Sequence, residues 1–350
     1  MLNIGMAQSS TASMNIDNNV TVKEALLPEE HVKVKIFLKK HHLDYDKDIE
    51  ETFYIENSED IIATISRSNH IIKGLAVDHE HRGKNLATML VSKIVNAMRR
   101  DKIYAYMVYT KTMYVYVFES LNFRMIANTE NVCLMEGGLG SIEQDIETMK
   151  TSLEQNHHVN LEKKDVGAIV VNCNPMTKGH HRLITESAKR HDVFIVFVVQ
   201  EDESFFTFKE RFSIVHLALS DDDSIIVVPS GKYIVSNLTF PSYFLKSINE
   251  RQKEHAKLDG IIFRDYFLTA FNIRKRYVGT ETIDVMCAYN DILKTYLGER
   301  LVEIKRFEQA GETISASLVR KHIANGENDK ALSYVPKSTR MMLRGIINEK

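Results

Sequence analysis

Cysteine is scarce in this chain, and none of its three cysteines, Cys133, Cys173 and Cys287, forms a C-x-x-C pair. This argues against a disulfide scaffold and against a zinc site built on cysteines. The low cysteine content fits a reducing compartment, so we expect a cytoplasmic protein.

No apolar run approaches the roughly 18 residues that a membrane span requires. The N-terminus has no basic segment followed by an apolar core, which argues against a secretory signal. We expect residues 1–20 to be a disordered tail.

A charge excess of either sign is also lacking, since the formal net charge is −2. A general binder of nucleic acid or other polyanions is therefore not expected, and neither is a membrane partner. The 350 residues are 44% hydrophobic and 26% charged, which is ordinary for a globular protein with a sizeable core. This length allows one to three domains.

The first half of the chain shows mixed patterning. In FYIENSEDIIATISRSNHIIKGLAVD, short β-rich runs alternate with turn residues, as in antiparallel strands. ATMLVSKIVNAMRR is apolar at helical spacing and ends in basic residues, which suit a helix C-terminus. From Glu136 to Asp165, glycines precede a polar, charged helical segment. We interpret this segment as a connector between two domains.

The second half repeats one theme, in which short apolar runs are mostly separated by helix-like segments. The runs are Val166–Val171, Val193–Val199, Ile225–Val228, Ile261–Phe263 and Leu301–Ile304. This alternation is typical of βαβ units and of a parallel sheet covered on both faces. The fold class is therefore α/β, and ligands are expected at the carboxyl ends of the strands, near the switch point.

The stretch NCNPMTKGHHRLITESA, residues 172–188, follows the first of these strands. The chain has only five prolines and 15 glycines, yet Pro175 and Gly179 both stand here, shaping a loop that a ligand can approach closely. The helix that follows offers free N–H groups and a positive dipole end to an anion. His180 and His181 stand at its start. Two interpretations remain open: a phosphate contact, or a capping His180 beside a solvent-facing His181.

A second segment, GETISASLVRKHI, lies near the C-terminus. Ser315 and Ser317 are good N-cap residues for the helix that follows. Arg320 comes three positions after Ser317, about one turn into that helix. A helix N-terminus with hydroxyls and an arginine is suited to clamp a phosphate. Simple capping by the two serines is the alternative.

TKGH, followed far downstream by ISASLVR, resembles the pair of motifs (H/T)xGH and ISSTxxR of the nucleotidyltransferase superfamily, and the two segments stand in the same order. Its members, among them pantetheine-phosphate adenylyltransferases, attack the α-phosphate of a nucleoside triphosphate and expel pyrophosphate. The resemblance implies that Thr177 and His180 contact the triphosphate, with His180 stabilising charge in the transition state. It also implies that Ser315, Ser317 and Arg320 hold the β- and γ-phosphates.

Asn174 and Gly179 belong to the same implied nucleotide-binding loop. No general base is required, because such transfers are catalysed mainly by positioning and charge stabilisation.

Four further segments, VVQEDESFFTFKERFSIV, SNLTFPSYFLK, RKRYVGTET and AYNDILK, resemble the citrate lyase ligase family from about residue 30 to the end of the chain. On this resemblance Arg211 is a further candidate phosphate ligand, with a surface helix position as the alternative. Tyr289 and Asn290 are implied to line the adenylate pocket. Asp259 either orients the nucleotide or caps a strand, and the sequence does not separate the two.

In the first half, HRGKNLATML resembles the acyl-CoA pyrophosphate loop of GNAT acetyltransferases, whose pattern is Q/R-x-x-G-x-G/A. Arg82 and Ala87 fit this pattern, while Asn85 replaces the middle glycine. Asparagine tolerates left-handed backbone geometry better than most residues, so we expect the loop to survive. YVYVFESLNF resembles a later GNAT helix. Such a domain either holds a thiol arm, with Arg82 as a ligand, or serves as a scaffold.

The family resemblance implies an ATP-dependent acid–thiol ligase. Acetate and ATP would give acetyl-adenylate and pyrophosphate. The phosphoribosyl-dephospho-CoA thiol arm on the acyl carrier subunit of citrate lyase would then take the acetyl group and release AMP. Mg²⁺ would bridge the phosphates and need few protein ligands; no dedicated metal cage is visible in the sequence.

The implied domains are a GNAT-like α+β domain at 21–138, a connector helix at 139–165 and a Rossmann-like nucleotidyltransferase domain at 166–350. Three other functions remain open. The first is a plain adenylyltransferase acting on phosphopantetheine or a similar small phosphate. The second is a GNAT acetyltransferase with a nucleotide-binding regulatory domain. The third is a non-catalytic nucleotide-binding regulator, against which the intact Thr177, His180 and Arg320 argue.

Overall fold

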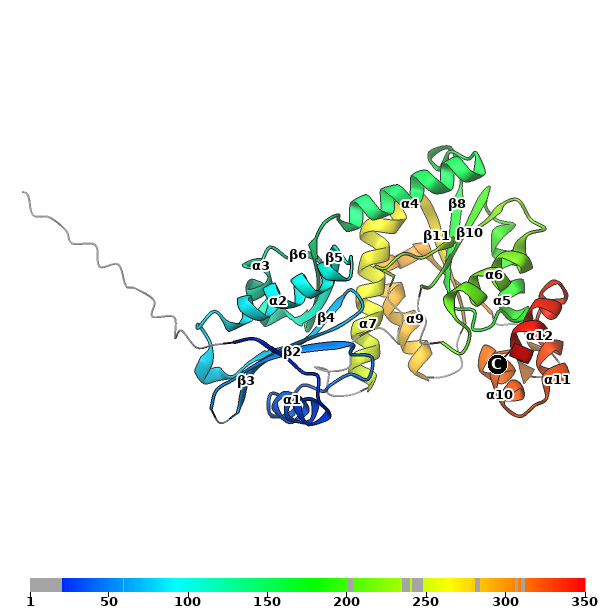
Figure 1. The fold of residues 1–350 in the computed structure, drawn as a ribbon. Helices are drawn as coiled ribbons and strands as arrows, with labels where there is room; N and C mark the ends of the chain where they lie inside the picture. Colours follow the sequence, from blue (N-terminus) through cyan, green and yellow to red (C-terminus); the bar gives the residue numbers. More distant parts are fainter. Residues whose placement is uncertain are drawn as a thin grey trace, which may run out of the picture. The chain divides into compact units, whose positions relative to one another are not determined.

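The computed structural model describes residues 21–58, 60–200, 204–234, 240, 248–280, 284–305, 308–309 and 312–349. The chain forms two compact units, residues 1–104 and 105–350 (Figure 1). The expected tail at 1–20 lies outside the described residues, as does most of SNLTFPSYFLK. The domain limits expected at 138 and 165 stay a prediction.

The first unit is built on antiparallel strands. Its elements are β1 (Lys23–Glu24), α1 (Pro28–Lys40), β2 (Glu51–Glu56), β3 (Ile61–Ser68), β4 (Ile71–Val77), η1 (His79–His81) and α2 (Leu86–Arg100). β2 pairs with β3, and β3 with β4, both antiparallel. Helix α2 buries Leu90, Val91, Ile94 and Met98, which recur at helical spacing. The strands and the helix expected from this part of the sequence are thus confirmed.

The second unit opens with three antiparallel strands and a long helix. Its first elements are β5 (Ala105–Lys111), η2 (Thr112–Tyr114), α3 (Val115–Glu119), β6 (Arg124–Asn128), β7 (Val132–Gly138), α4 (Ile142–His157) and η3 (Leu161–Lys163). Strand β7 pairs with both β5 and β6. Helix α4 starts because the Ser141 hydroxyl caps it by accepting from the Gln144 N–H at 3.3 Å. The polar helix expected in this stretch is confirmed.

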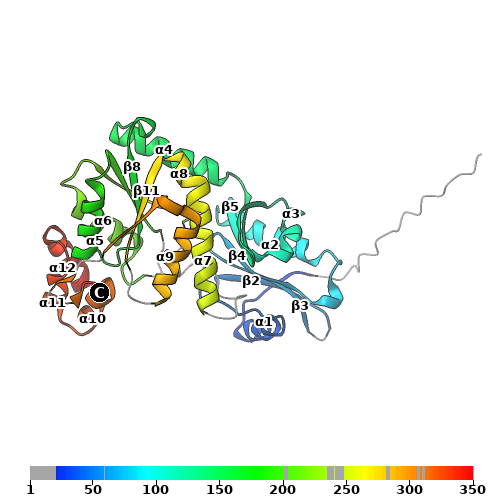
Figure 2. The ribbon, with the colours of Figure 1, turned by 180° about the vertical axis from the view of Figure 1, so that it is seen from behind.

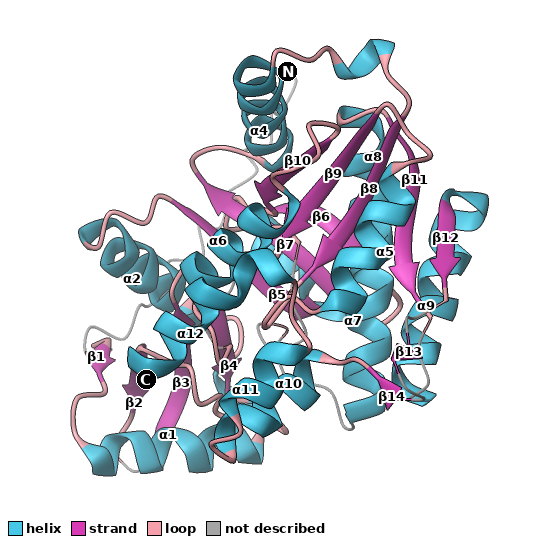
Figure 3. Ribbon diagram, turned by 90° about the vertical axis from the view of Figure 1, so that its right-hand side faces the viewer, coloured by secondary structure: helices cyan, strands magenta, loops and turns pink. Residues whose placement is uncertain are grey.

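A five-stranded, all-parallel sheet forms the rest of the second unit, in the order β10-β9-β8-β11-β12. Its strands are β8 (Val166–Val171), β9 (Val193–Val198), β10 (Ile225–Pro229), β11 (Ile273–Gly279) and β12 (Leu301–Ile304). Figure 3 shows β8, β9, β10 and β11 side by side. This sheet confirms the α/β fold class.

Helices cover both faces of the sheet. They are α5 (Lys178–Ala188), α6 (Phe208–Leu219), α7 (Ile248–Ile262) and α9 (Asp284–Leu297). Figures 1 and 2 show α5 and α6 on one face and α7 and α9 on the other, as right-handed crossovers require. The chain moves from β8 to β9 and β10, and then returns to β11 on the other side of β8. The topological switch point therefore lies between β8 and β11.

One expected strand is wrong. Ile261–Phe263 is not a strand, because Ile261 and Ile262 end helix α7 and Phe263 begins the π-helical turn η4 (Phe263–Phe267), which short helix α8 (Leu268–Ala270) follows. A three-residue apolar run fits a helix end as well as a strand. The fourth strand is instead β11, whose IRKRYVG sequence carries three basic residues that hide its strand character.

The C-terminal helices pack against the α5 and α6 face of the sheet. After η5 (Gly298–Arg300) and β12, the chain forms the short strands β13 (Glu308–Gln309) and β14 (Glu312–Thr313), and then α10 (Ala316–Ala324), α11 (Asn328–Ser333), η6 (Lys337–Thr339) and α12 (Arg340–Glu349). Val319, Leu332 and Leu343 join the core that Ile184 of α5 and Ile214 of α6 also enter. This packing brings the second sequence motif toward the first. Among the described residues, no helix is long and apolar enough to span a membrane.

Candidate active site

The loop after β8 occupies the switch point of the sheet. It runs from Asn172 to Thr177 and leads into α5. Strand β9 lies on one side of β8 and β11 on the other, so the order in which the chain adds strands to the sheet reverses here. Cys173 has a φ of 49°, in the left-handed region, and the Asn174–Pro175 bond is cis. In open α/β sheets the crevice at such a point is where ligands bind.

Thr177 and His180 cap the start of α5 reciprocally. The buried Thr177 hydroxyl accepts from the His180 N–H at 3.3 Å, and Nδ1 of His180 accepts from the Thr177 N–H at 3.2 Å. A ring nitrogen that accepts carries no proton, so the neutral imidazole carries its proton on Nε2. His180 thus caps the helix through Nδ1, which confirms the capping interpretation. In this tautomer Nε2 is a hydrogen-bond donor.

Gly179 lets the two sequence motifs meet. A Cβ on Gly179 would lie 3.3 Å from the Ile314 carbonyl oxygen, at the residue before Ser315. The Lys178 N–H donates to the Tyr334 carbonyl at 2.9 Å, which also fixes the C-terminal segment to the start of α5. A side chain at Gly179 would push these two segments apart.

Arg320 joins the motifs directly. Its Nη1 donates to the Asn174 carbonyl and its Nη2 donates to the Ser317 hydroxyl at 3.2 Å. Ser315 is the N-cap of α10 and accepts from the Leu318 N–H at 3.1 Å, as expected for one of the two serines. Burial lowers the pKa of Arg320, but a guanidinium stays protonated in proteins. A cation thus lies between the loop after β8 and the N-terminus of α10.

Asn174 links this loop to a third segment. Its carbonyl receives Arg320, and its Oδ1 accepts from the Phe206 N–H at 3.1 Å, just before α6 begins. The structure therefore brings together seven of the residues expected at the site: Asn174, Thr177, Gly179, His180, Ser315, Ser317 and Arg320.

Arg211 does not match either expectation. It is fully buried, so it is not on a helix surface. Its Nη1 donates to the carbonyls of Asn172 at 2.9 Å and Val199 at 3.0 Å, and its Nε donates to the Phe206 carbonyl at 3.2 Å. Because its guanidinium is engaged with backbone carbonyls, a role as a phosphate ligand does not fit. Arg211 instead ties the carboxyl ends of β8 and β9 together.

Tyr289 and Asn290 lie on α9 beside the end of β11. Asn290 is buried and donates to the Gly279 carbonyl at 3.0 Å, at the carboxyl end of the strand next to β8. The Tyr289 hydroxyl donates to Oδ2 of Asp259, which also forms an ion pair with Arg276 at 2.7 Å. The strand-capping interpretation of Asp259 is wrong, because this residue is buried within α7 and joins α7 to β11 and α9. Its orientation of a nucleotide stays a prediction.

Arg82 belongs to the other compact unit. It is exposed and follows η1, and Gly83 and Asn85 after it have φ values of 80° and 62°. Asn85 adopts the left-handed conformation as the N-cap of the 15-residue helix α2. The expectation that asparagine preserves this loop is confirmed.

Sequence reasoning missed Arg276. It lies within β11, is 2% exposed and stacks over Phe263 at 4.3 Å from its guanidinium carbon to the ring centre. Its ion pair with Asp259 could not be predicted from the local sequence, because the two residues lie on different elements, β11 and α7. In the described part of the chain, no three His, Cys, Asp or Glu side chains gather in a way that could hold a metal ion.

The fold and this site define an α/β protein with two capped helix N-termini, a histidine and an arginine at the topological switch point of its parallel sheet. Comparison with known families gives the same picture. The profile described as "Citrate lyase ligase C-terminal domain" matches residues 166–343, and that of the "Acetyltransferase (GNAT) family" matches residues 22–123. Residues 22–123 are thus GNAT-like.

Curated relatives cover most of the chain. A [Citrate [pro-3S]-lyase] ligase from Escherichia coli (strain K12) is 30% identical over 89% of this chain and 89% of its own length. The enzymes of that name from Haemophilus influenzae and Klebsiella pneumoniae are 30% and 27% identical, each over 87% of this chain and over 92% and 89% of their own lengths. The chain belongs to the citrate lyase ligase family.

Proposed function

We propose that this protein is an ATP-dependent acid–thiol ligase that acetylates the thiol arm of the citrate lyase acyl carrier subunit and so activates citrate lyase. The observation that carries this proposal is the joining of the two sequence motifs at the switch point by Arg320, which donates to both Asn174 and Ser317. Membership of the citrate lyase ligase family supports a ligase reaction that acts on citrate lyase.

In the first step a carboxylate oxygen of acetate attacks the α-phosphorus of ATP. The bond to the pyrophosphate oxygen breaks, which gives acetyl-adenylate and pyrophosphate. His180, held by Thr177 with its proton on Nε2, donates to the phosphate oxygens, where charge develops in the transition state. No proton has to be moved, because the acetate anion is already a nucleophile.

The β- and γ-phosphates lie against the N-termini of α5 and α10, with Arg320 and the hydroxyls of Ser315 and Ser317 as their side-chain ligands. Gly179 allows the two helix starts to approach each other. Mg²⁺ would supply further neutralisation of the phosphate charge and would need few protein ligands.

The adenosine end lies toward β11, where Asn290 holds the Gly279 carbonyl and Tyr289 is anchored by Asp259. Arg211 acts as a positioning residue that fixes the ends of β8 and β9.

In the second step the thiol sulfur of the carrier arm attacks the carbonyl carbon of acetyl-adenylate. The carbon–oxygen bond to phosphate breaks, AMP leaves, and the thiol proton passes to water. The product is an acetyl thioester on the carrier subunit. Arg82, which follows η1 in the loop that leads into α2, is the candidate ligand for the diphosphate of the arm. The few cysteines support a cytoplasmic location.

A plain adenylyltransferase uses the same motifs but has no need of residues 22–123, which match the GNAT family. The relatives named as citrate lyase ligases match both halves of the chain. This favours the ligase over both the adenylyltransferase and a GNAT acetyltransferase with a regulatory domain.

Product analysis tests the proposal. We expect the purified chain with ATP, Mg²⁺, acetate and the thiol form of the carrier to release AMP and pyrophosphate in equal amounts and to form one acetyl thioester for each AMP. Formation of the thioester from acetyl-CoA without AMP would contradict the proposal and support the acetyltransferase.

A further inference from the structure

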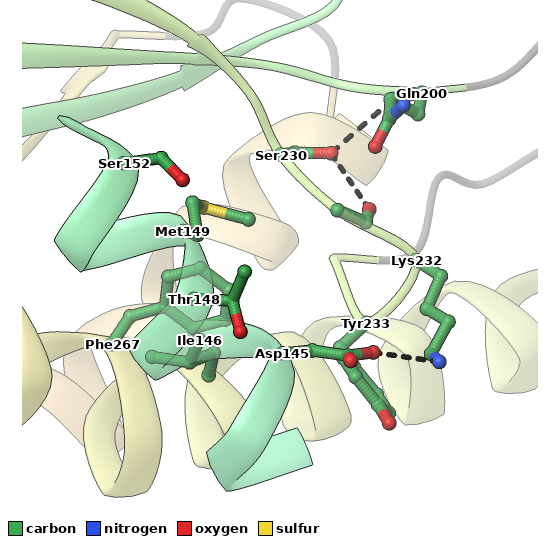
Figure 4. Close-up of a pocket in the computed structure, with 11 residues that line it drawn as sticks. Asp145, Ile146, Thr148, Met149, Ser152, Gln200, Ser230, Lys232, Tyr233 and Phe267 are labelled. Atoms are coloured by element: carbon green, nitrogen blue, oxygen red, sulfur yellow. Dashed lines mark hydrogen bonds and ion pairs between the residues drawn. The ribbon is translucent and has the colours of Figure 1, made fainter. Parts of the chain in front are cut away.

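A pocket of about 380 Å³ lies in the second unit at the carboxyl ends of β9 and β10 (Figure 4). Helix α4 forms one wall, the segment after β10 forms another, and Gln200 after β9 and Phe267 of η4 complete the lining. None of the residues assigned above to ATP lines it. The volume falls within the range of about 300–1,000 Å³ that is typical of small-molecule sites, and it is much larger than acetate requires.

The lining is mainly apolar and carries no uncompensated charge. Ile146, Met149 and Phe267 supply apolar surface, and Figure 4 shows the hydroxyl-bearing side chains of Thr148 and Ser152 among them. Its two charged residues, Lys232 and Asp145, form an ion pair with each other at 2.6 Å (Figure 4). Because the lysine charge is neutralised, this pocket suits an uncharged ligand with apolar and amide groups better than a carboxylate or a phosphate.

Several contacts preform the pocket. The buried Tyr233 hydroxyl donates to Glu136 at 2.6 Å, which anchors the segment after β10. The Ser230 hydroxyl accepts from the Gln200 N–H at 3.2 Å, which joins the ends of β9 and β10 (Figure 4). Gly231 has a φ of 74°, and a Cβ there would lie 2.9 Å from the terminal methyl carbon of Met149. A glycine at this position therefore lets the pocket walls approach each other.

The pocket is tied to the candidate active site through one buried side chain. Gln200 follows Val199, whose carbonyl accepts from Nη1 of Arg211. The same nitrogen donates to the carbonyl of Asn172, where the loop after β8 begins. Since β8 and β9 are neighbours in the sheet, the pocket lining at Gln200 and the loop that leads to His180 on α5 start from adjacent strand ends.

We propose that this pocket binds the uncharged, thiol-bearing end of a pantetheine-type arm, which consists of amides, methyl groups and a thiol. The inference deepens the proposed function and rests on it. The pocket brings the sulfur to the acetyl-adenylate, where it forms the C–S bond as the C–O bond to AMP breaks. Under this proposal residues 105–350 hold the reacting end of the arm, whatever the GNAT-like unit binds.

Two substitutions that fill the pocket test the proposal, with one matched control. Thr148 and Ser152 are exposed residues of α4 that line the pocket, and Thr151 is an exposed residue of the same helix that does not. We expect Thr148→Phe and Ser152→Phe to weaken the binding of free pantetheine at least tenfold, measured by calorimetry. We expect them to raise the KM for the carrier similarly, while Thr151→Phe leaves both values within twofold.

The acetate-dependent exchange of pyrophosphate into ATP uses no thiol, so we expect the pocket variants to keep it within twofold. Unchanged pantetheine binding in both folded pocket variants would overturn the inference. A raised KM for acetate in the exchange would overturn it too, by assigning the pocket to the acid. If the wild-type chain shows no acetate-dependent exchange, the proposed function fails. Pantetheine binding by the variants then still decides whether the pocket holds the arm.

Discussion

At the scale of single residues, the hydrogen bonds of His180 determine which ring nitrogen carries the proton that it can donate. The Thr177 N–H points at Nδ1, so the same contact that starts α5 also selects the tautomer with a proton on Nε2. From the sequence alone, a capping residue and a phosphate ligand were competing interpretations of His180. The capping contact uses Nδ1 and so leaves the proposed phosphate contact to Nε2.

An asparagine at this position separates the two roles. His180→Asn keeps an oxygen near the position of Nδ1 that can accept from the Thr177 N–H, but it removes the Nε2 donor. We expect roughly a 10²-fold loss of kcat, because one donor to the transition state is lost, with a Tm close to that of the wild type. Steady-state kinetics and thermal unfolding measure the two effects, and His181→Asn is the matched control. A near-normal rate in folded His180→Asn would remove His180 from the mechanism.

Cys173 lies within the loop after β8 and gives a second test at this scale. Its side chain is buried, and this burial raises its pKa to about 12, although nearby Arg211 acts in the opposite direction. The thiolate is the reactive form of cysteine. We therefore expect Cys173 to resist iodoacetamide at pH 8 in the folded protein and to react after unfolding. Peptide mass mapping measures this; alkylation of Cys173 in the native state would contradict the assigned burial.

At the scale of elements, the parallel sheet could be predicted because β8, β9, β10 and β12 are short apolar runs. Strand β11 could not, since Arg276 interrupts its apolar pattern and is accommodated only by Asp259 on another element. The burial of Arg211 had a usable signal. It stands three, four and seven residues before Ile214, Val215 and Ala218, on the buried face of α6.

The ion pair of Asp259 and Arg276 holds three elements together. We expect Asp259→Asn to lower the free energy of unfolding by about 3–5 kcal/mol, because it leaves the Arg276 charge buried and uncompensated. Urea unfolding measures this effect. Asp329→Asn, which breaks the exposed pair with Arg344 at 2.8 Å, is the control and should change little. An equally small effect of Asp259→Asn would contradict the structural role given to this pair.

The pH dependence of this pair follows from the Asp259 carboxyl. Burial raises its pKa, but Arg276 and the Tyr289 hydroxyl lower it further, so the net pKa lies below the usual value. A depressed carboxyl pKa stabilises the folded state above the unfolded pKa of about 3.9, and this contribution is lost as the pH falls through the folded pKa. The difference between wild type and Asp259→Asn should therefore be constant from neutral pH to about pH 5 and shrink in more acidic solution.

At the scale of the whole molecule, two kinds of domain lie on one chain, and the citrate lyase ligase relatives match both. The sequence motifs were enough to indicate the family and the loop after β8. The contacts that join Arg320 to Asn174, 146 positions earlier, depend on how the C-terminal helices pack on α5 and α6. Long-range packing of this kind leaves no periodic trace in the sequence.

Exchange of labelled pyrophosphate into ATP by the purified chain tests the central claim most directly. It requires only Mg²⁺, ATP and acetate, and it reports the first step without the carrier. The account predicts exchange that depends on acetate and that falls roughly 10²-fold in His180→Asn. No exchange with acetate, together with exchange when phosphopantetheine and dephospho-CoA are present, would contradict acid activation and show an adenylyltransferase instead.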